Sequence, residues 1–381
     1  VPLALRDIQA GIRAECEDQP ADFLSRKLEN RWLEARFQLS TWLGTKEENI
    51  AFCENATAAM NELAAWFPLT PGDEILLNDH EYGAVHRIWQ RKCAQTGAQL
   101  RVSKLPLQME HSQQIVDAIL RGCTDKTRCV VVSHITSPTA IRLPVEEICT
   151  ALKQQGIPVC IDGPHALLQE PLKLNRLGCD FYTASCHKWL SAPIGSGMLY
   201  VHSDWHSQVE PSRLSWGRLP PTIPKQWSDE LLWSGTRDYS AYLTVPEAIR
   251  FFQLFSTEQV DARNHELACY ALRKLCEIPG TEPVTPKDRR WFGWMTAVRL
   301  PDLPEVFYTS LQQRILHGYG VEVPIIKFRD RYLVRVSCHL HTTTHDVDLL
   351  VRGLRKELAT AGSPQDQPAQ RGDFGIAFAG K

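Results

Sequence analysis

Residues 157–190 read IPVCIDGPHALLQEPLKLNRLGCDFYTASCHKWL and contain two short apolar runs, 157–161 and 181–184. Each run has the length and the β-branched or aromatic content of a buried strand. An acid, Asp162, follows the first run directly, and a lysine, Lys188, follows the second after a short polar turn. Open α/β sheets bind their ligands beyond the carboxyl ends of their strands. The stretch therefore predicts two strands of a buried sheet that carry an acid and an amine at its ligand-binding edge.

The same alternation extends over much of the chain. From residue 47 to residue 202, short apolar runs alternate with amphipathic stretches of helical periodicity. Strands and helices in alternation are typical of the α/β class, with a mostly parallel sheet flanked by helices. We therefore expect an α/β fold whose strands are residues 49–53, 74–77, 99–105, 129–134, 158–162, 181–184 and 197–202.

Changes in the pattern divide the chain into four expected parts. Residues 1–44 read as an N-terminal helical segment, and residues 45–244 as a large α/β domain. Residues 245–361 read as a smaller C-terminal α+β domain that opens with one long helix, 245–275. Residues 362–381 are rich in Gly, Ser, Pro and Gln, a composition that predicts a disordered tail.

The charge balance excludes some classes of partner. The 381 residues include 42 Lys and Arg against 44 Asp and Glu, a formal net charge of -2. A protein built to neutralise nucleic acid or an anionic membrane needs an excess of basic residues, so we expect neither partner. No apolar stretch reaches the roughly 20 residues that span a bilayer.

The cysteines indicate a reducing compartment. The twelve cysteines are scattered, and no two form a Cys-x-x-Cys pair. Several lie within apolar runs, as small buried hydrophobic residues do, so we expect a cytoplasmic protein. The chain begins at Val1 without a signal-peptide pattern, and we expect that it is processed or that its true start lies earlier.

Three features together indicate a pyridoxal phosphate site. This cofactor needs a lysine amine for its Schiff base, a carboxylate beside its ring nitrogen and an anion cradle for its phosphate. Lys188 and Asp162 are the amine and the acid. The small-residue turn 55–59 lies between a predicted strand and a predicted helix, where backbone N–H groups bind anions. Gly195-x-Gly197 matches only part of the Gly-x-Gly-x-x-Gly motif that binds dinucleotides such as NAD. The third glycine is missing, and the fragment does not follow the first predicted strand, so we reject the NAD-binding alternative.

Five blocks of residues, in order along the chain, resemble the class V aminotransferase family of fold-type I pyridoxal phosphate enzymes. Within that family they are similar to the subgroup of isopenicillin N epimerase-like proteins and cysteine or cystine C–S lyases. The resemblance covers roughly residues 1–360 and implies a fold-type I architecture. The blocks are Asp79–Ala84, Ile161–His165, Ser185–Leu190, Ser234–Asp238 and Val334–His339.

The resemblance implies a role for each matching residue. Lys188 would carry the cofactor and move the α-proton of an amino-acid substrate. Asp162 would pair with the ring nitrogen, His165 would bond the phenolic oxygen and Tyr82 would lie over the ring. The phosphate would be held by Ala56, Thr57, Ser185 and His187.

Two further residues carry implications for substrate and assembly. Arg335 would bind the substrate carboxylate, a task suited to a bidentate guanidinium. Thr236 matches a phosphate contact that the family supplies from a neighbouring subunit, so the resemblance implies a homodimer with shared active sites. Three of the matching residues could instead have a purely structural role. His165 and Tyr82 could be core, and Arg335 could form a surface ion pair.

The predicted chemistry begins with α-proton removal and has several possible outcomes. We expect β-elimination, as in a C–S lyase acting on cysteine, cystine or a related thioether or sulfoxide. Alternatives are an epimerase or racemase, then an aminotransferase, then a catalytically silent relative that only binds. Residues 318–326, where desulfurases of the family carry a nucleophilic cysteine, contain none, which argues against a persulfide relay. Members of the family usually have a glycine-containing N-terminal segment that enters the active site, at positions before the point where this sequence begins. The resemblance therefore implies that part of the substrate contacts is not represented in residues 1–381.

Two histidines near the C-terminal end of the small domain could form part of a metal site, but we interpret them as structural residues. His339-x-His341 places two imidazoles on one strand face. With no third ligand at a recognisable spacing, we expect no metal there.

Overall fold

The structure is a computed structural model that describes residues 1–107, 109–215 and 226–360. The expected disordered tail, residues 362–381, lies outside this part of the chain. None of the helices within it is both long and apolar enough to cross a bilayer.

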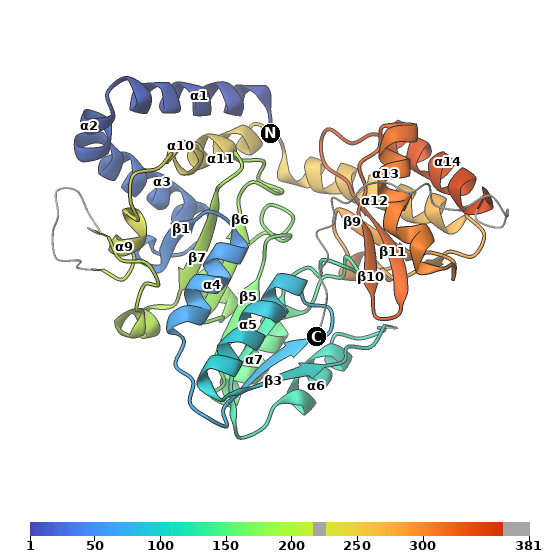
Figure 1. The fold of residues 1–381 in the computed structure, drawn as a ribbon, viewed down its shortest axis with the longest axis horizontal. Helices are drawn as coiled ribbons and strands as arrows, with labels where there is room; N and C mark the ends of the chain where they lie inside the picture. Colours follow the sequence, from blue (N-terminus) through green and yellow to red (C-terminus); the bar gives the residue numbers. More distant parts are fainter. Residues whose placement is uncertain (108, 216–225, 361–381) are drawn as a thin grey trace.

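A seven-stranded sheet forms the centre of the larger part of the molecule (Figure 1). Its strand order is β1-β7-β6-β5-β4-β2-β3. Only β7 runs against the others, because it pairs antiparallel with both β1 and β6 while the remaining pairs are parallel. The α/β prediction with a mostly parallel sheet is therefore confirmed. The strands are β1 Ile50–Cys53, β2 Glu74–Asn78, β3 Gln99–Ser103, β4 Thr127–Ser133, β5 Val159–Asp162, β6 Phe181–Ser185 and β7 Gly197–Val201.

Helices cover both faces of this sheet. One face packs on α4 and α5, and the other on α3, α6, α7 and α11. The strands supply both cores by strict alternation: Val130 and Val132 face one core, while Cys129 and Val131 face the other. The helices of this part are α1 Leu3–Asp18, α2 Pro20–Asp22, α3 Leu28–Trp42, α4 Ala56–Trp66, α5 Gly83–Thr96, α6 Gln113–Gly122, α7 Val145–Gln154, α8 Leu174–Leu177, α9 Asp229–Leu232, α10 Ser240–Leu243 and α11 Val245–Gln253.

A second, smaller unit lies beside the first, as the orange part of Figure 1 shows. Its four-stranded sheet is entirely antiparallel, with the order β10-β11-β9-β8. Three helices share a hydrophobic core with it. The elements are α12 Thr257–Cys276, β8 Glu282–Pro283, β9 Met295–Arg299, α13 Glu305–Tyr319, β10 Ile325–Phe328, β11 Arg331–Ser337 and α14 Thr344–Thr360.

The N-terminal segment is helical but interrupted. Helix α1 ends at Asp18, and Gln19 leaves the helical region with φ -140°. The break has a local cause, because Pro20 disfavours helical backbone at the residue before it. A π-helical turn, Phe23–Lys27, then leads into α3.

The expected single helix over residues 245–275 is wrong. The chain forms α11 and α12 instead, separated by Leu254, Phe255 and Ser256. Ser256 is the N-cap of α12, and its hydroxyl accepts a hydrogen bond from the Gln259 backbone N–H at 3.3 Å. Ser followed three residues later by Gln is a recognised helix-start pattern. The sequence thus contained a helix-start pattern at Ser256, but the apolar periodicity continues across it and favoured the interpretation as one helix.

Candidate active site

Five strands of the large sheet end at one edge, and the loops that follow them enclose a cavity of about 400 Å³. The loops after β1, β2, β4, β5 and β6 all line it, as expected where parallel strands end together. Eight of the ten predicted site residues lie on its wall: Ala56, Thr57, Tyr82, Asp162, His165, Ser185, His187 and Lys188. A separate cavity of about 470 Å³ lies at the opposite edge of the sheet and contains none of them.

Lys188 lines the cavity, and the residue is exposed there. It follows β6 by three residues, and its backbone N–H donates to the Ser185 carbonyl at 3.3 Å. The enclosing walls lower the pKa of this amine to about 8, and the Arg335 charge lowers it further while Asp162 opposes the shift. About a tenth of the amine is thus neutral at pH 7, against about one part in several thousand for an ordinary lysine, and the neutral form is what a nucleophile or base requires.

Asp162 is the last residue of β5, and its side chain is buried. The Thr183 hydroxyl on the neighbouring strand β6 donates to Asp162 Oδ1 at 2.6 Å. Burial raises the pKa of the carboxyl, although this hydrogen bond and the nearby Lys188 charge oppose the shift. A cation placed beside the carboxylate would favour its charged form. The turn after it needs Gly163, since a Cβ there would lie 2.0 Å from the Tyr182 hydroxyl.

His165 is buried three residues after Asp162, within contact of the lysine. Its Nε2 lies 3.4 Å from Lys188 Nζ, and the Trp189 indole N–H donates to its Nδ1 at 3.2 Å. Burial, together with the charges of Lys188 and Arg335, lowers the pKa of this imidazole well below its ordinary value. The side chain is therefore a neutral imidazole with both nitrogens committed.

The start of α4 forms an anion cradle. Asn55 caps this helix by accepting the Ala58 N–H at 2.8 Å, and the Ala56 N–H donates to Ser185 Oγ at 3.0 Å. The Ser185 hydroxyl proton can then be donated into the cavity, next to the positive end of the helix dipole. Gly197 allows this approach, because a Cβ there would lie 2.6 Å from the Asn55 Cα.

His187 lies beside this cradle in a definite orientation. Its Nδ1 lies 2.9 Å from the Ser196 carbonyl oxygen, which can only accept, so Nδ1 carries a proton. Burial lowers the pKa of the ring, which leaves Nε2 unprotonated. A bound phosphate dianion would favour protonation of Nε2, and His187 would then donate to it.

Arg335 lies on β11 of the small sheet and reaches the edge of the site. Its Nη1 donates to the Ser137 carbonyl at 2.7 Å and to the Ser137 hydroxyl at 3.0 Å, and Ser137 lines the cavity. Its Nε is buried and has no hydrogen-bond partner among the described residues. Burial lowers the pKa of the guanidinium to about 10. A buried, unpartnered N–H on a charged group is expected where a ligand completes the hydrogen bonding.

Thr236 does not join the other site residues. It is exposed, and it is not among the residues that line the cavity. Tyr82, by contrast, lies at the cavity wall just before α5 and is 51% exposed, so it is not a core residue. Sequence reasoning missed one serine and one indole that hold site residues in place. Ser137 and Trp189 act through long-range contacts that no local motif indicates.

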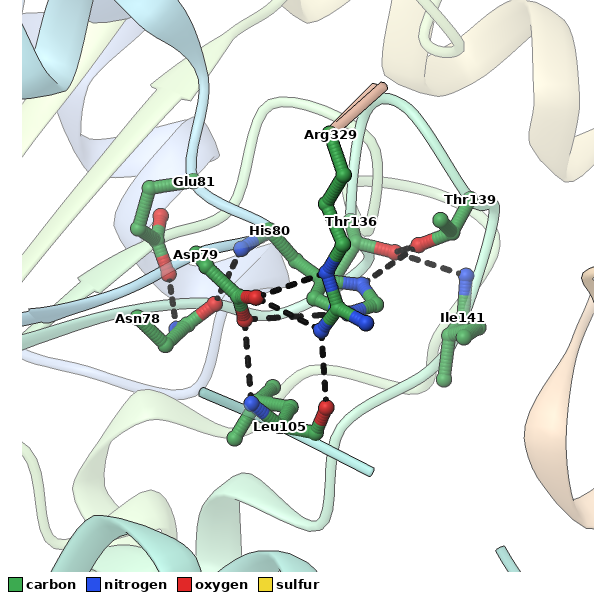
Figure 2. A network of polar contacts seen from close by, with 9 residues as sticks. All are labelled: Asn78, Asp79, His80, Glu81, Leu105, Thr136, Thr139, Ile141 and Arg329. Atoms are coloured by element: carbon green, nitrogen blue, oxygen red, sulfur yellow. Dashed lines mark hydrogen bonds and ion pairs between the residues drawn. The ribbon is translucent and has the colours of Figure 1, made fainter. Parts of the chain in front are cut away.

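A polar network links the small sheet to the loop that carries Tyr82 (Figure 2). Arg329, at the tip of the β10–β11 hairpin, donates to Asp79 Oδ2 at 2.9 and 2.6 Å and to the Leu105 carbonyl at 3.0 Å. Next to Asp79, the buried His80 bonds Thr139 through Nδ1 at 2.8 Å. Thr139 lies two residues from Ser137, so one network connects the hairpin, the Tyr82 loop and the loop that holds Arg335.

We expect Arg329→Gly to destabilise the protein less than Arg329→Ala. Both variants lose the ion pair with Asp79, which is worth about 1 kcal/mol or less at a partly exposed position. Arg329 has φ +51°, a left-handed conformation that glycine adopts freely and alanine does not. Urea unfolding of both variants measures the difference. A lower free energy of unfolding for the glycine variant than for the alanine variant would contradict the inference that Arg329 is strained at this turn.

The fold and the site together define a pyridoxal phosphate-dependent enzyme. A family model, Aminotransferase class-V, matches residues 23–350. The chain is 34% identical to an isopenicillin N epimerase of Amycolatopsis lactamdurans over 91% of this chain and 89% of that protein. It is 30% identical to a putative L-cysteine desulfhydrase of Oryza sativa subsp. japonica over 97% of this chain and 84% of that one. The chain belongs to the aminotransferase class-V family.

The fold has close counterparts among solved structures. A complex of the cystine C–S lyase C-DES with its reaction product, cysteine persulfide, superimposes with a TM-score of 0.81 at 20% identity, covering 93% of this chain and 94% of that one. The predicted fold-type I architecture is therefore confirmed. The residues at the cavity fit the cofactor of this family, since they offer an amine, a buried acid and an anion cradle within one enclosure.

We expect covalent uptake of pyridoxal phosphate by the cofactor-free protein to accelerate as the pH is raised through about 8. Only the neutral amine attacks an aldehyde, and desolvation by the cavity walls lowers the pKa of Lys188 to about 8, with Asp162 raising it and Arg335 lowering it. The rate should level off at higher pH, where the amine is fully neutral. Stopped-flow absorbance records this profile.

Arg335→Gln is the matched control for that profile. Removing the positive charge should raise the pKa of Lys188 and move the midpoint to higher pH. A midpoint near the ordinary lysine value in the parent protein, or no displacement in the variant, would contradict the assigned electrostatics.

Proposed function

We propose that this enzyme removes the α-proton of an amino acid and then expels a sulfur leaving group from the β-carbon, as a C–S lyase. Its substrate would be cysteine, cystine or a related thioether or sulfoxide. The observation that supports this is the position of Lys188, the one amine among the described residues that line the cavity. Elimination needs a single base and a leaving group that is stable as a thiolate, and Lys188 can supply that base.

The chain's own residues have complementary tasks in this reaction. Arg335 offers Nε, which has no partner among the residues that the structure describes, to the substrate carboxylate while Ser137 holds Nη1 in place. Lys188 in its neutral form would take the α-proton and could return it to the departing sulfur. Asp162, which is buried, would favour a proton on the ring nitrogen of the bound cofactor. When bound, pyridoxal phosphate supplies the electron sink for the carbanion that proton removal leaves.

Epimerisation is the second candidate. It is favoured by similarity to proteins named isopenicillin N epimerase, at 34% and 32% identity over 91% and 90% of this chain. Epimerisation needs a second acid or base on the far side of the α-carbon, and Tyr82 is the group that could serve. A phenol is a weak base near neutral pH, which makes it a poorer fit than the single-base elimination.

Product analysis with Tyr82→Phe separates the two reactions. The protein is incubated with L-cysteine, L-cystine and their D forms, and pyruvate, sulfide and optical rotation are followed. A lyase releases pyruvate, and the Tyr82→Phe variant keeps that activity because its base is Lys188. A change of optical rotation without pyruvate, abolished in Tyr82→Phe, would establish the epimerase instead.

We propose further that the enzyme is a homodimer in which Thr236 completes the partner's site. In support, Thr236 is exposed away from the cavity of its own chain, and two large apolar residues, Ile194 and Leu214, are 82% and 78% exposed. Light scattering gives the assembly state. Mixing Lys188→Ala subunits with Thr236→Ala subunits should restore one intact site per mixed dimer, whereas sites confined to single chains would show no restoration.

A cytoplasmic location is part of the same proposal. All twelve cysteines lie within the described residues and are free thiols, eight of them buried. Free thiols persist in a reducing compartment. Fractionation of the source cells tests this location directly.

A further inference from the structure

The residue after Lys188 is a buried tryptophan whose polar atom points back into the site. Trp189 is 5% exposed, and its indole N–H donates to His165 Nδ1 at 3.2 Å. An indole nitrogen can only donate. The receiving nitrogen of His165 must therefore lack a proton.

This contact determines where the single proton of His165 lies. The ring is buried, and burial lowers its pKa well below the ordinary value, which keeps it neutral. A neutral imidazole carries one proton, so with Nδ1 occupied by the indole the proton is on Nε2. Nε2 lies 3.4 Å from Lys188 Nζ. His165 therefore presents an N–H to the lysine, and Lys188 can accept it only as a neutral amine.

The indole itself is held in place from the small sheet. The His339 ring stacks on Trp189 with centroids 5.7 Å apart and planes 9° apart. His339 Nε2 lies 2.8 Å from the Trp189 carbonyl oxygen, and its Nδ1 accepts the Leu340 N–H at 2.7 Å. The Trp294 ring meets Trp189 edge-on at 5.7 Å. His339, considered above as half of a metal pair, thus supports Trp189.

We infer that Trp189 is a positioning residue that fixes the Nε2–H tautomer of His165 and so directs a hydrogen-bond donor toward Lys188. The inference deepens the proposed function, since it concerns the base of that same site. Without the indole N–H, Nδ1 can carry the proton, and Nε2 then becomes an acceptor. An acceptor beside Lys188 stabilises the ammonium form, which can neither attack the cofactor nor take a proton.

The test measures the tautomer directly. The full chain is labelled with ¹⁵N-histidine and examined by long-range ¹H–¹⁵N NMR, with the cofactor bound and again without it. His165 is assigned from the signal that disappears in His165→Gln. In the parent protein we expect one nitrogen protonated, Nε2. In Trp189→Phe we expect the tautomer ratio to change by roughly fivefold to tenfold, the effect of one hydrogen bond.

Trp294→Phe is the matched control. Trp294 belongs to the same aromatic cluster, but its indole N–H donates to Asp261 Oδ1 at 2.9 Å and not to His165. The Trp294→Phe substitution should therefore leave the His165 tautomer unchanged. If Trp189→Phe does not fold, replacement of Trp189 by 3-benzothienylalanine keeps the ring shape and removes only the N–H.

The outcomes separate this inference from the proposed reaction. An unchanged tautomer in both Trp189 variants, or a parent protein protonated at Nδ1, would overturn the inference. An altered tautomer in the Trp189 variants alone would support it, even if the protein shows no C–S lyase activity. Because the signal is recorded without turnover, failure of the lyase reaction and failure of the tautomer inference are independent results.

Discussion

Replacing Lys188 with alanine should abolish turnover and the visible absorbance of covalently bound cofactor. The lysine is the one amine among the described residues that line the cavity, and its pKa of about 8 leaves about a tenth of it neutral at pH 7. Removing a general base alone costs up to about 10⁴-fold in rate. The measurement is a visible spectrum of the purified variant together with pyruvate release from L-cysteine.

Lys188→Arg serves as the control for this variant. It keeps a positive charge next to Asp162 and His165 but removes a group that can lose its proton at neutral pH. The Lys188→Arg variant should therefore be as inactive as the Lys188→Ala variant. Turnover that survives in either variant would show that the reaction does not use this amine.

Replacing Asp162 with asparagine should reduce turnover by up to about 10³-fold while cofactor remains bound. The substitution keeps the size of a buried side chain and removes its charge. A neighbouring carboxylate raises the pKa of a cation by about 1–3 units, and each unit is a tenfold change in protonation. The lost protonation of the ring nitrogen should weaken its electron-accepting capacity by that factor.

Thr183→Val separates charge from geometry at the same position. It removes the hydroxyl that donates to Asp162 at 2.6 Å but leaves the carboxylate in place. We expect it to lose far less activity than Asp162→Asn. Equal losses in the two variants would mean that orientation, and not charge, is what Asp162 contributes. Turnover and the pH dependence of the cofactor absorbance are measured for both.

The strands and the two central groups of the site could be predicted from local sequence. Apolar runs of strand length ending at Asp162 and before Lys188 reflect burial on both faces of a sheet, which is a property of each run alone. Parallel strands place their carboxyl ends together, so it could be expected that Asp162 and Lys188 lie at the same edge of the sheet. The break between α11 and α12 was missed although Ser256 signalled it.

Long-range contacts were beyond any local pattern. Arg335 is held by Ser137, 198 positions earlier in the chain, and Arg329 is paired with Asp79, 250 positions away. Lys188 and Trp189 are adjacent in sequence, but their side chains are connected only through His165, which lies on a different loop and contacts both of them. Residue type and spacing determined which groups could carry the chemistry, because burial and backbone periodicity act locally. The tertiary structure alone decided which nitrogen of His165 carries its proton and that Arg335 Nε has no partner among the described residues, because both depend on atoms that only packing brings within hydrogen-bond distance.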